Sequence, residues 1–559
     1  MKLNSKIMEP AVLFLFFTLF LYLALGSQWD NRIKHDFPYG YGASDAFFHQ
    51  SVAEYMKAQG IVKYTPPYEV GNHDFVYDAH PPMLFVLSSQ ISIFSGIEVY
   101  DSILLLSALL WIFSGILVYI LIKRFNKMIA LLSVPVMIFT LTGNFKIPLY
   151  WGYWLFIAGV FFLIAAFWAF SRLDLHNSWI LLGLFMGALG ISHIPEVFFV
   201  ALFIAIYFAI DCFSKKKFDI PVFRKILFAA ILALLISAFS LNIFFATFAE
   251  TEGFRNKFDT ELGNGSVYLK DIGLIGLAFA AGLIVFLVLK KKDFAGWFAI
   301  FMFFVSYLTL IGFGKRAATH RWFWYFYLAF FFGLLAYQII KLVYKNVSYE
   351  GVAIISIVLL IIFSYPLFSQ GSGSGIMNAY DWQGLSWIAD NVPKDARVFY
   401  FYSDALGQSA ALYNSKHLAF NLVRNDLFEA IQNKEIRRTY QFGLADSYAA
   451  YLCDATPFNY RYFRNNPEIK GQLEECTAKN HTRIETVEYS LDICDADYIY
   501  FDKQASQPVL AQYNLIVRQI LLQNNYTEQV YENELVSIIK NNDLGEDCLG
   551  KNTSIIKLE

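Results

Sequence analysis

Long apolar stretches separated by short polar segments run through the first two thirds of the chain. Allowing roughly 20 residues for each helical crossing of a bilayer, we predict eleven spanning helices, at 10–27, 102–122, 128–143, 152–170, 178–192, 196–213, 222–248, 268–289, 294–313, 322–341 and 351–368. The apolar stretch 83–97 follows Pro81 and Pro82, and we interpret it as an interfacial or re-entrant helix. The pattern predicts an α-helical polytopic membrane protein.

Composition supports this fold class and excludes others. Of the 559 residues 57% are hydrophobic and only 16% are charged, whereas about a quarter of residues are charged in soluble domains. The net charge of -2 is the sum of two unlike parts. Residues 1–370 are basic, with 27 Lys+Arg and 21 Asp+Glu, whereas residues 371–559 are acidic, with 17 Lys+Arg and 25 Asp+Glu. Because no basic stripe with interleaved aromatic residues occurs, nucleic acid is not an expected partner.

Basic clusters between the apolar stretches predict the topology. If Lys2 and Lys6 are cytoplasmic, the alternation of spans places the clusters at 123–127, 215–217, 290–292 and 341–345 on the same side, as the positive-inside rule requires. If 83–97 also crossed the membrane, all of these basic clusters would lie on the side opposite to the N-terminus, against the positive-inside rule. We therefore predict a multi-pass protein of the cell membrane with a cytoplasmic N-terminus, whose large first loop, 28–100, and C-terminal part are extracytoplasmic.

The predicted domains are a transmembrane domain, residues 1–370, and an extracytoplasmic α/β domain, residues 371–559, which begins with a Gly/Ser linker. In the second domain we predict helices at 380–391 and 507–523, strands at 397–402 and 497–502, and a hairpin at 528–540. Four of the five cysteines, Cys453, Cys476, Cys494 and Cys548, lie there. This even number suits two disulfides in an oxidising compartment, with the pairing left open, and Cys212 is alone.

Polar residues gather in the predicted first outer loop. Ser44 can cap a helix that runs to about Gln59, which places Asp45 and His49 one turn apart on the same face. Asp78 and His80 immediately precede Pro81. A carboxylate at the mouth of a membrane cavity is partly desolvated, which raises its pKa and suits it to act as a general base. Alternatively, Asp45 is there only because the helix dipole favours an acid, with His49 solvated.

A second cluster departs from the predicted charge pattern, because it is basic on the outer side. Lys315, Arg316, His320 and Arg321 lie at the start of a predicted span, where they could hold a phosphate or pyrophosphate together with the helix N-terminus. The alternatives are lipid head groups or acids of the C-terminal domain. Glu196, beside His193, and the pair Glu250 and Glu252 also lie at predicted span ends, and we favour structural roles for these acids.

This arrangement resembles the GT-C superfamily of polytopic glycosyltransferases, which use polyprenyl-phosphate-linked sugars and include protein mannosyltransferases, aminoarabinose transferases and oligosaccharyltransferase catalytic subunits. The resemblance rests on the motif 44–49 (Ser-Asp-Ala-Phe-Phe-His) in a large first outer loop, on the segment 78–82, and on many helices followed by an external domain. In that family the acid of the first outer loop is the catalytic base or a metal-linked residue, and this role maps onto Asp45. The Trp-Trp-Asp-Tyr-Gly signature by which oligosaccharyltransferase recognises its acceptor is missing, so transfer to an asparagine sequon is not implied.

We therefore expect a membrane glycosyltransferase that moves a sugar, with inversion, from a polyprenyl-phosphate donor to a glycan, lipid or protein acceptor on the outer face. The expected residues are Asp45 and Asp78 for catalysis; His49, His80, Lys315, Arg316, His320 and Arg321 for substrate binding; and Asp45, Asp78 and Glu252 as candidate ligands of an Mg²⁺ or Mn²⁺ ion. One alternative is a non-enzymatic transporter or flippase of lipid-linked glycans, in which paired repeats with ionisable residues near the midplane are typical. A glycan ligase or polymerase is a further alternative that differs only in donor and acceptor.

Overall fold

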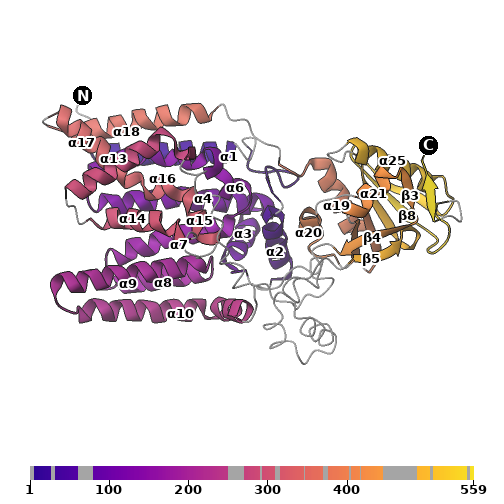
Figure 1. Ribbon diagram of the computed structural model, residues 1–559, viewed down its shortest axis with the longest axis horizontal. Helices are drawn as coiled ribbons and strands as arrows, with labels where there is room; N and C mark the ends of the chain where they lie inside the picture. Colours follow the sequence, from indigo (N-terminus) through magenta and orange to yellow (C-terminus); the bar gives the residue numbers. More distant parts are fainter. Residues whose placement is uncertain are drawn as a thin grey trace.

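The chain forms a helical part, built by residues up to 368, and a sheet-containing part that follows it (Figure 1). The structure is a computed structural model. It describes residues 5–26, 32–43, 45–60, 80–249, 270–289, 293–308, 315–344, 346–368, 375–393, 395–401, 405–415, 417–422, 424–444, 488–503, 508–549 and 554–558. The sheet packs against one end of the helical part, which we call the sheet-facing end.

Among the described residues, six helical segments are long and apolar enough to cross a membrane. They are Ile7–Gly26 within α1 (Ser5–Gly26), Val99–Lys123 (α4), Pro195–Lys215 (α9), Ile220–Leu241 within α10 (Ile220–Ala249), Ala317–Val343, which includes α17 (Ala329–Val343), and Tyr349–Leu367, which includes α18 (Tyr349–Ser364). Shorter apolar helices are α3 (Met83–Ser95), α7 (Trp154–Phe170), α8 (Ser178–Gly190), α13 (Leu274–Val288) and α14 (Phe294–Val305).

The prediction of eleven spanning helices is confirmed in part. A helix is present in each predicted range, but only six reach spanning length, and the range 128–143 belongs to a pair of helical segments, Lys127–Leu141 and Gly143–Tyr150, bent by 84°. Within that pair α5 (Lys127–Ser133) gives way at Pro135 to the 3₁₀ segment η1 (Pro135–Leu141). Proline has no backbone N–H to continue an α-helix, so an uninterrupted apolar run in the sequence is not an uninterrupted helix.

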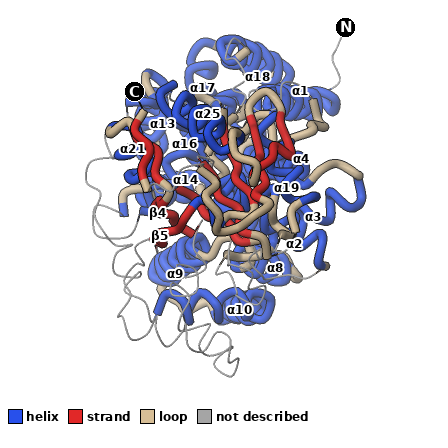
Figure 2. Tube along the Cα trace, turned by 90° about the vertical axis from the view of Figure 1, so that its right-hand side faces the viewer, coloured by secondary structure: helices blue, strands red, loops and turns tan. Residues whose placement is uncertain are grey.

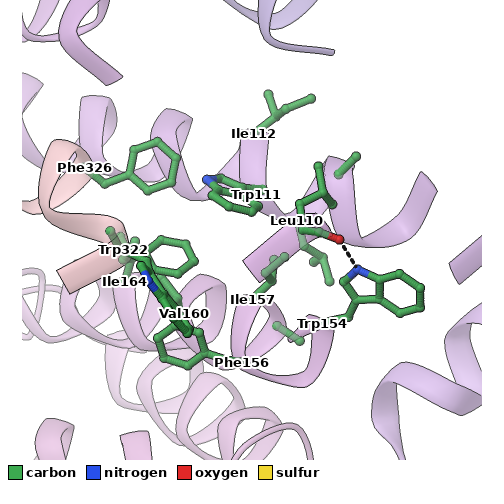
Figure 3. Close-up of a cluster of buried hydrophobic side chains, with 14 of the residues drawn as sticks. Leu110, Trp111, Ile112, Trp154, Phe156, Ile157, Val160, Ile164, Trp322 and Phe326 are labelled. Carbon is green, nitrogen blue, oxygen red and sulfur yellow. Dashed lines mark hydrogen bonds between the residues drawn. The ribbon is translucent and has the colours of Figure 1, made fainter. Parts of the chain in front are cut away.

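Helix α7 forms the centre of the helical part. It is apolar on every side, and nearly all of its residues are buried, as expected for a helix surrounded by others. It packs against α4, α8 and α9. Figure 3 shows aromatic side chains of this core, with Phe156 of α7 beside Trp322, and Trp154, the first residue of α7, apart from them. In contrast, many large apolar side chains of α9, α10, α13 and α18 are exposed, as suits helices that face lipid.

The C-terminal part is a seven-stranded mixed sheet in the order β5-β4-β2-β1-β6-β8-β7. Its strands are β1 (Arg397–Phe401), β2 (Leu418–Leu422), β4 (Thr439–Leu444), β5 (Glu488–Asp492), β6 (Tyr498–Asp502), β7 (Thr527–Glu532) and β8 (Val536–Asn541); β3 (Glu435–Arg437) pairs with β9 (Ile555–Lys557). The central strand β1 is parallel to β2 and β6. The other pairs in the seven-stranded sheet are antiparallel.

In the described residues of this part, the sheet is accompanied by α19 (Ala379–Asn391), α20 (Ala405–Ala411), α21 (Arg424–Gln432) and α25 (Pro508–Leu522). Phe399 and Phe401 of β1 share a core with Val517 of α25, whereas Val398 and Tyr400 belong to the core that continues into the helical part. This alternation follows the two-residue period of a strand. The predicted helices, strands and hairpin of this region are confirmed, with ends shifted by one or two residues.

One of the predicted disulfides is present in the described part of the chain. Cys494 and Cys548 are bonded, 54 residues apart in the sequence. Cys453 and Cys476 lie outside the described residues. Cys212 is a free cysteine, as predicted.

The two parts meet where the predicted first outer loop lies. Helix α20 packs against α2 (Asp45–Gln59), and Gln59 Nε2 donates to Asn414 Oδ1 at 2.9 Å. The N–H of Ile376 donates to the carbonyl of Tyr41 at 2.8 Å. In Figure 2, which views the molecule from the sheet side, the strands lie in front of the helices. The sheet part therefore covers the segment that leads into Asp45.

Candidate functional site

Asp45 is the first residue of α2, at the sheet-facing end of the helical part (Figure 1). The predicted helix to Gln59 is confirmed, but its proposed cap, Ser44, lies outside the described residues. The segment that precedes Asp45 is bonded to the turn before α7, because the N–H of Gly42 donates to the carbonyl of Tyr150 at 2.9 Å. At Gly152 of the same turn, a Cβ atom would lie only 2.6 Å from the backbone nitrogen of Ala46. The position of Asp45 therefore depends on close backbone packing.

The structure brings Asp45, His49 and His80 into one region. His49 is buried, and its ring centroid lies 6.5 Å from that of His80 and 6.0 Å from that of Trp154. His80 is exposed and lies near enough to Asp45 to interact with it electrostatically. The side chain of Asp45 is exposed, but partial desolvation by the surrounding protein raises the pKa of its carboxyl, and the charge of His80 partly opposes this. Asp78, the second predicted catalytic acid, lies outside the described residues.

The predicted phosphate-binding cluster begins in α15 (Lys315–Thr319), continues through the 3₁₀ segment η5 (His320–Phe323) and ends before α16 (Trp324–Tyr327). Only the backbone of Lys315 and Arg316 is described. His320 and Arg321 are fully buried, and Arg321 Nε donates to the carbonyl of Ser306 at 3.2 Å. The guanidinium of Arg321 also lies 5.1 Å from the ring centroid of Tyr307. These two side chains are thus inside the protein and not on its surface.

An acid at the start of α9 explains the burial of His320. Glu196 Oε1 lies 3.1 Å from His320 Nε2, and Glu196 Oε2 bonds to His193 Nδ1. The other ring nitrogen of His320, Nδ1, lies 3.0 Å from the hydroxyl of Tyr327. In the sequence only the adjacency of His193 and Glu196 indicated this network, and we favoured a structural role for that pair.

The first turn of α7 lies between the two groups. Trp154 contacts His49, while the ring of Phe156 lies 5.7 Å from His193 and 5.1 Å from His320. The segments that carry His80 and His193 are also joined, because the N–H of Met83 donates to the carbonyl of Ile191 at 3.1 Å. The helix that carries Asp45 and the basic cluster, distant in sequence, therefore pack against the same turn of α7.

The predicted metal site remains a prediction. No group of three or more His, Cys, Asp or Glu side chains in the described part of the chain is arranged to hold a metal ion. Asp78 and Glu252, two of the three candidate ligands, lie outside that part. Asp45 alone provides one carboxylate, whereas Mg²⁺ prefers several oxygen ligands.

Glu54, two turns after Asp45 in α2, makes the stability of this region dependent on pH. Its side chain is buried, and burial raises its pKa from the usual 4.5 to about 7. The folded state therefore holds a proton that the unfolded chain releases, and stability falls as pH rises from about 4.5 to 7. This difference corresponds to about 3 kcal/mol. We expect Glu54→Gln to unfold at a higher temperature than the wild type at pH 8 and at nearly the same temperature at pH 4.5.

Thermal unfolding of purified protein across this pH range tests the prediction. Glu528→Gln is the matched control, because Glu528 is exposed on β7 and its replacement should not change the pH dependence. If the unfolding temperature of Glu54→Gln changed with pH as that of the wild type does, the burial of Glu54 would not be the cause of the pH dependence.

Comparisons with known proteins identify solved structures that share this fold. No family model and no curated protein matches the sequence. The archaeal oligosaccharyltransferase AglB from Archaeoglobus fulgidus, solved in complex with an inhibitory peptide and a dolichol-phosphate, aligns with a TM-score of 0.50 at 13% identity over 92% of this chain and 71% of its own. ArnT from Cupriavidus metallidurans, bound to undecaprenyl phosphate, aligns with a TM-score of 0.52 at 9% identity over 96% of this chain and 97% of its own.

The chain is therefore structurally similar over most of its length to GT-C enzymes, and its fold is GT-C-like. This confirms the resemblance inferred from the motif 44–49 and the order of the elements. Identities of 9 and 13% identify a shared fold, and the function must be argued from the residues of the site.

Proposed function

We propose that this protein is a membrane glycosyltransferase that transfers a sugar from a polyprenyl-phosphate donor to an acceptor on the outer face of the membrane. The observation that carries the proposal is the position of Asp45, an exposed carboxylate at the start of α2 that interacts with His80 and lies one turn before His49, at the sheet-facing end of a GT-C-like fold. Two solved proteins with this fold hold dolichol-phosphate and undecaprenyl phosphate. These lipids support a polyprenyl phosphate as the donor carrier here.

In the proposed reaction Asp45 accepts the proton of an acceptor hydroxyl while the hydroxyl oxygen attacks the anomeric carbon of the donor sugar. The bond from that carbon to the phosphate oxygen breaks on the opposite side, so the configuration inverts. Its electrons remain on the polyprenyl phosphate, whose negative charge increases. Lys315 and Arg316 stabilise this charge directly, while Arg321, which is buried and bonded to the Ser306 carbonyl, adds its positive charge from inside the protein.

His49, His80 and Asp78 complete the proposed site. His49 is buried between Phe85 and Trp154, which keeps its ring in one place beside the base. His80 lies at the exposed edge, where it can contact substrate. A divalent cation bound by Asp45 and Asp78, with Glu252 as a further candidate, would help to neutralise the phosphate.

Mass spectrometry of lipids that co-purify with the protein tests the proposal directly. We expect a polyprenyl phosphate or its glycosylated form among them. Incubating the protein with the identified sugar donor and membrane extract should then transfer the sugar and release the polyprenyl phosphate. A preparation that binds lipid-linked sugar but moves it intact across vesicles, with no new glycosidic bond, would indicate a transporter and contradict the proposal.

A further inference from the structure

A buried acid lies between two imidazoles at the start of α9, next to the proposed phosphate site. The side chains of Glu196 and His320 are completely buried and that of His193 nearly so. Rings of Phe156 and Phe199 lie 5.1 Å from the ring of His320. In such surroundings a carboxylate is stable only while hydrogen-bond donors satisfy it, because an unpaired buried charge is strongly destabilising.

The hydrogen-bonding capacity of these groups determines the direction of each bond. An ionised carboxylate only accepts hydrogen bonds, so His320 Nε2 and His193 Nδ1 each donate to Glu196. In a neutral His320 the remaining nitrogen, Nδ1, is an acceptor. It therefore accepts the hydroxyl proton of Tyr327 at 3.0 Å. Glu196 and Tyr327 together select one tautomer and one orientation of the His320 ring.

This network connects segments far apart in the chain. Glu196 belongs to the first turn of α9, and His193 to the turn before it. His320 is the first residue of η5 and directly follows α15, which carries Lys315 and Arg316. Helix α7 packs closely against His193, since a Cβ atom at Gly159 would lie 2.7 Å from His193 Cβ. The C-terminal end of the basic segment is thus anchored in a fully packed site.

We propose that Glu196 is the positioning residue of the lipid-phosphate site, acting through His320 to hold the segment 315–321 in place. This inference rests on the proposed function, because it assigns the basic segment to the donor phosphate. Glu196 itself does not contact the phosphate. Its role is to fix the backbone from which Lys315, Arg316 and Arg321 extend.

Binding of undecaprenyl phosphate and of undecaprenol, which lacks the phosphate, tests this role in purified full-length protein in detergent. Because a hydrogen bond to a charged group is lost, Glu196→Ala should weaken undecaprenyl phosphate binding by about tenfold, with undecaprenol binding unchanged. Glu196→Gln should remain within about threefold of the wild type. Its carbonyl can accept from His320 Nε2 while its NH₂ donates to His193 Nδ1, so the geometry is kept without the charge.

Asp101→Ala is the matched control. Asp101 is another buried carboxylate bonded to an imidazole, since His35 Nδ1 lies 2.8 Å from its Oδ1. Its bonded partner His35 belongs to the first loop. Asp101→Ala should lower the unfolding temperature as much as Glu196→Ala but leave the affinity for undecaprenyl phosphate unchanged. If Glu196→Ala does not fold, Tyr327→Phe should weaken phosphate-lipid binding by about twofold to threefold.

The outcomes separate this inference from the proposed function. A wild type that binds undecaprenol as tightly as undecaprenyl phosphate would contradict both. A wild type that discriminates them, with Glu196→Ala or Tyr327→Phe unchanged, would overturn only the role of Glu196. Equal losses for Glu196→Gln and Glu196→Ala, or for Asp101→Ala and Glu196→Ala, would also overturn it, since charge or general stability would then explain the effect.

Discussion

Asp45→Asn should reduce sugar transfer by about a thousandfold or more, the range in which a general base contributes. Asparagine keeps the size of the side chain and can still accept a hydrogen bond, but it cannot take the acceptor proton. Partial desolvation raises the pKa of Asp45, so the native carboxylate is a stronger base than a fully solvated aspartate. Turnover of donor lipid by the purified variant measures the effect, and its unfolding temperature shows whether it is folded.

Asp36→Asn is the control for this substitution. Asp36 lies in the same outer segment and is exposed, as Asp45 is, but nothing assigns it to the site, so its replacement should leave transfer near the wild-type rate. Normal turnover by folded Asp45→Asn would remove Asp45 as the base. An equal loss in both variants would point to the charge of the segment and not to proton transfer.

Gly152→Ala should reduce transfer by about a hundredfold, because displacement of a catalytic group by about 1 Å has effects of this size. Gly152 has φ +83° and its added Cβ would lie 2.6 Å from the nitrogen and 2.8 Å from the Cα of Ala46. These are backbone atoms of the first turn of α2. The helix must therefore shift, and Asp45 moves with it.

Gly143→Ala separates this shift from backbone strain. Gly143 also has a positive φ, +48°, but a Cβ there would meet nothing within 4 Å. Alanine at such a φ costs about 1–2 kcal/mol, so Gly143→Ala should lose stability and keep most of its activity. If Gly152→Ala and Gly143→Ala kept equal transfer rates, the close approach of α2 to this turn would not matter for catalysis.

Local features of the site could be predicted from the sequence. The helix that carries Asp45 and His49 follows from a polar N-terminal position and helical spacing, and the structure has it at Asp45–Gln59. The same holds for β1, β6 and α25 of the C-terminal part, whose patterns of apolar residues have the period of a strand or a helix. The order of these elements was enough to indicate a GT-C-like fold.

Other features depend on partners that no local pattern contains. Hydropathy counts apolar residues, so it did not separate the six segments of spanning length from the shorter helices packed among them. His320 and Arg321 were expected to be available to a phosphate, but the structure buries both. His320 is held by Glu196, which bonds to it from 124 residues away in the sequence, and Arg321 by the carbonyl of Ser306.

The sequence by itself determined the apolar helices, the acidic C-terminal domain and the helical face shared by Asp45 and His49, because hydropathy, charge and helical spacing act over a few residues. Only the tertiary structure decided that the first turn of α7 lies between Asp45 and the basic segment, and that Cys494 pairs with Cys548. These contacts join residues that lie far apart along the chain. They form only when several helices pack together, because burial then forces each polar group to find a specific partner.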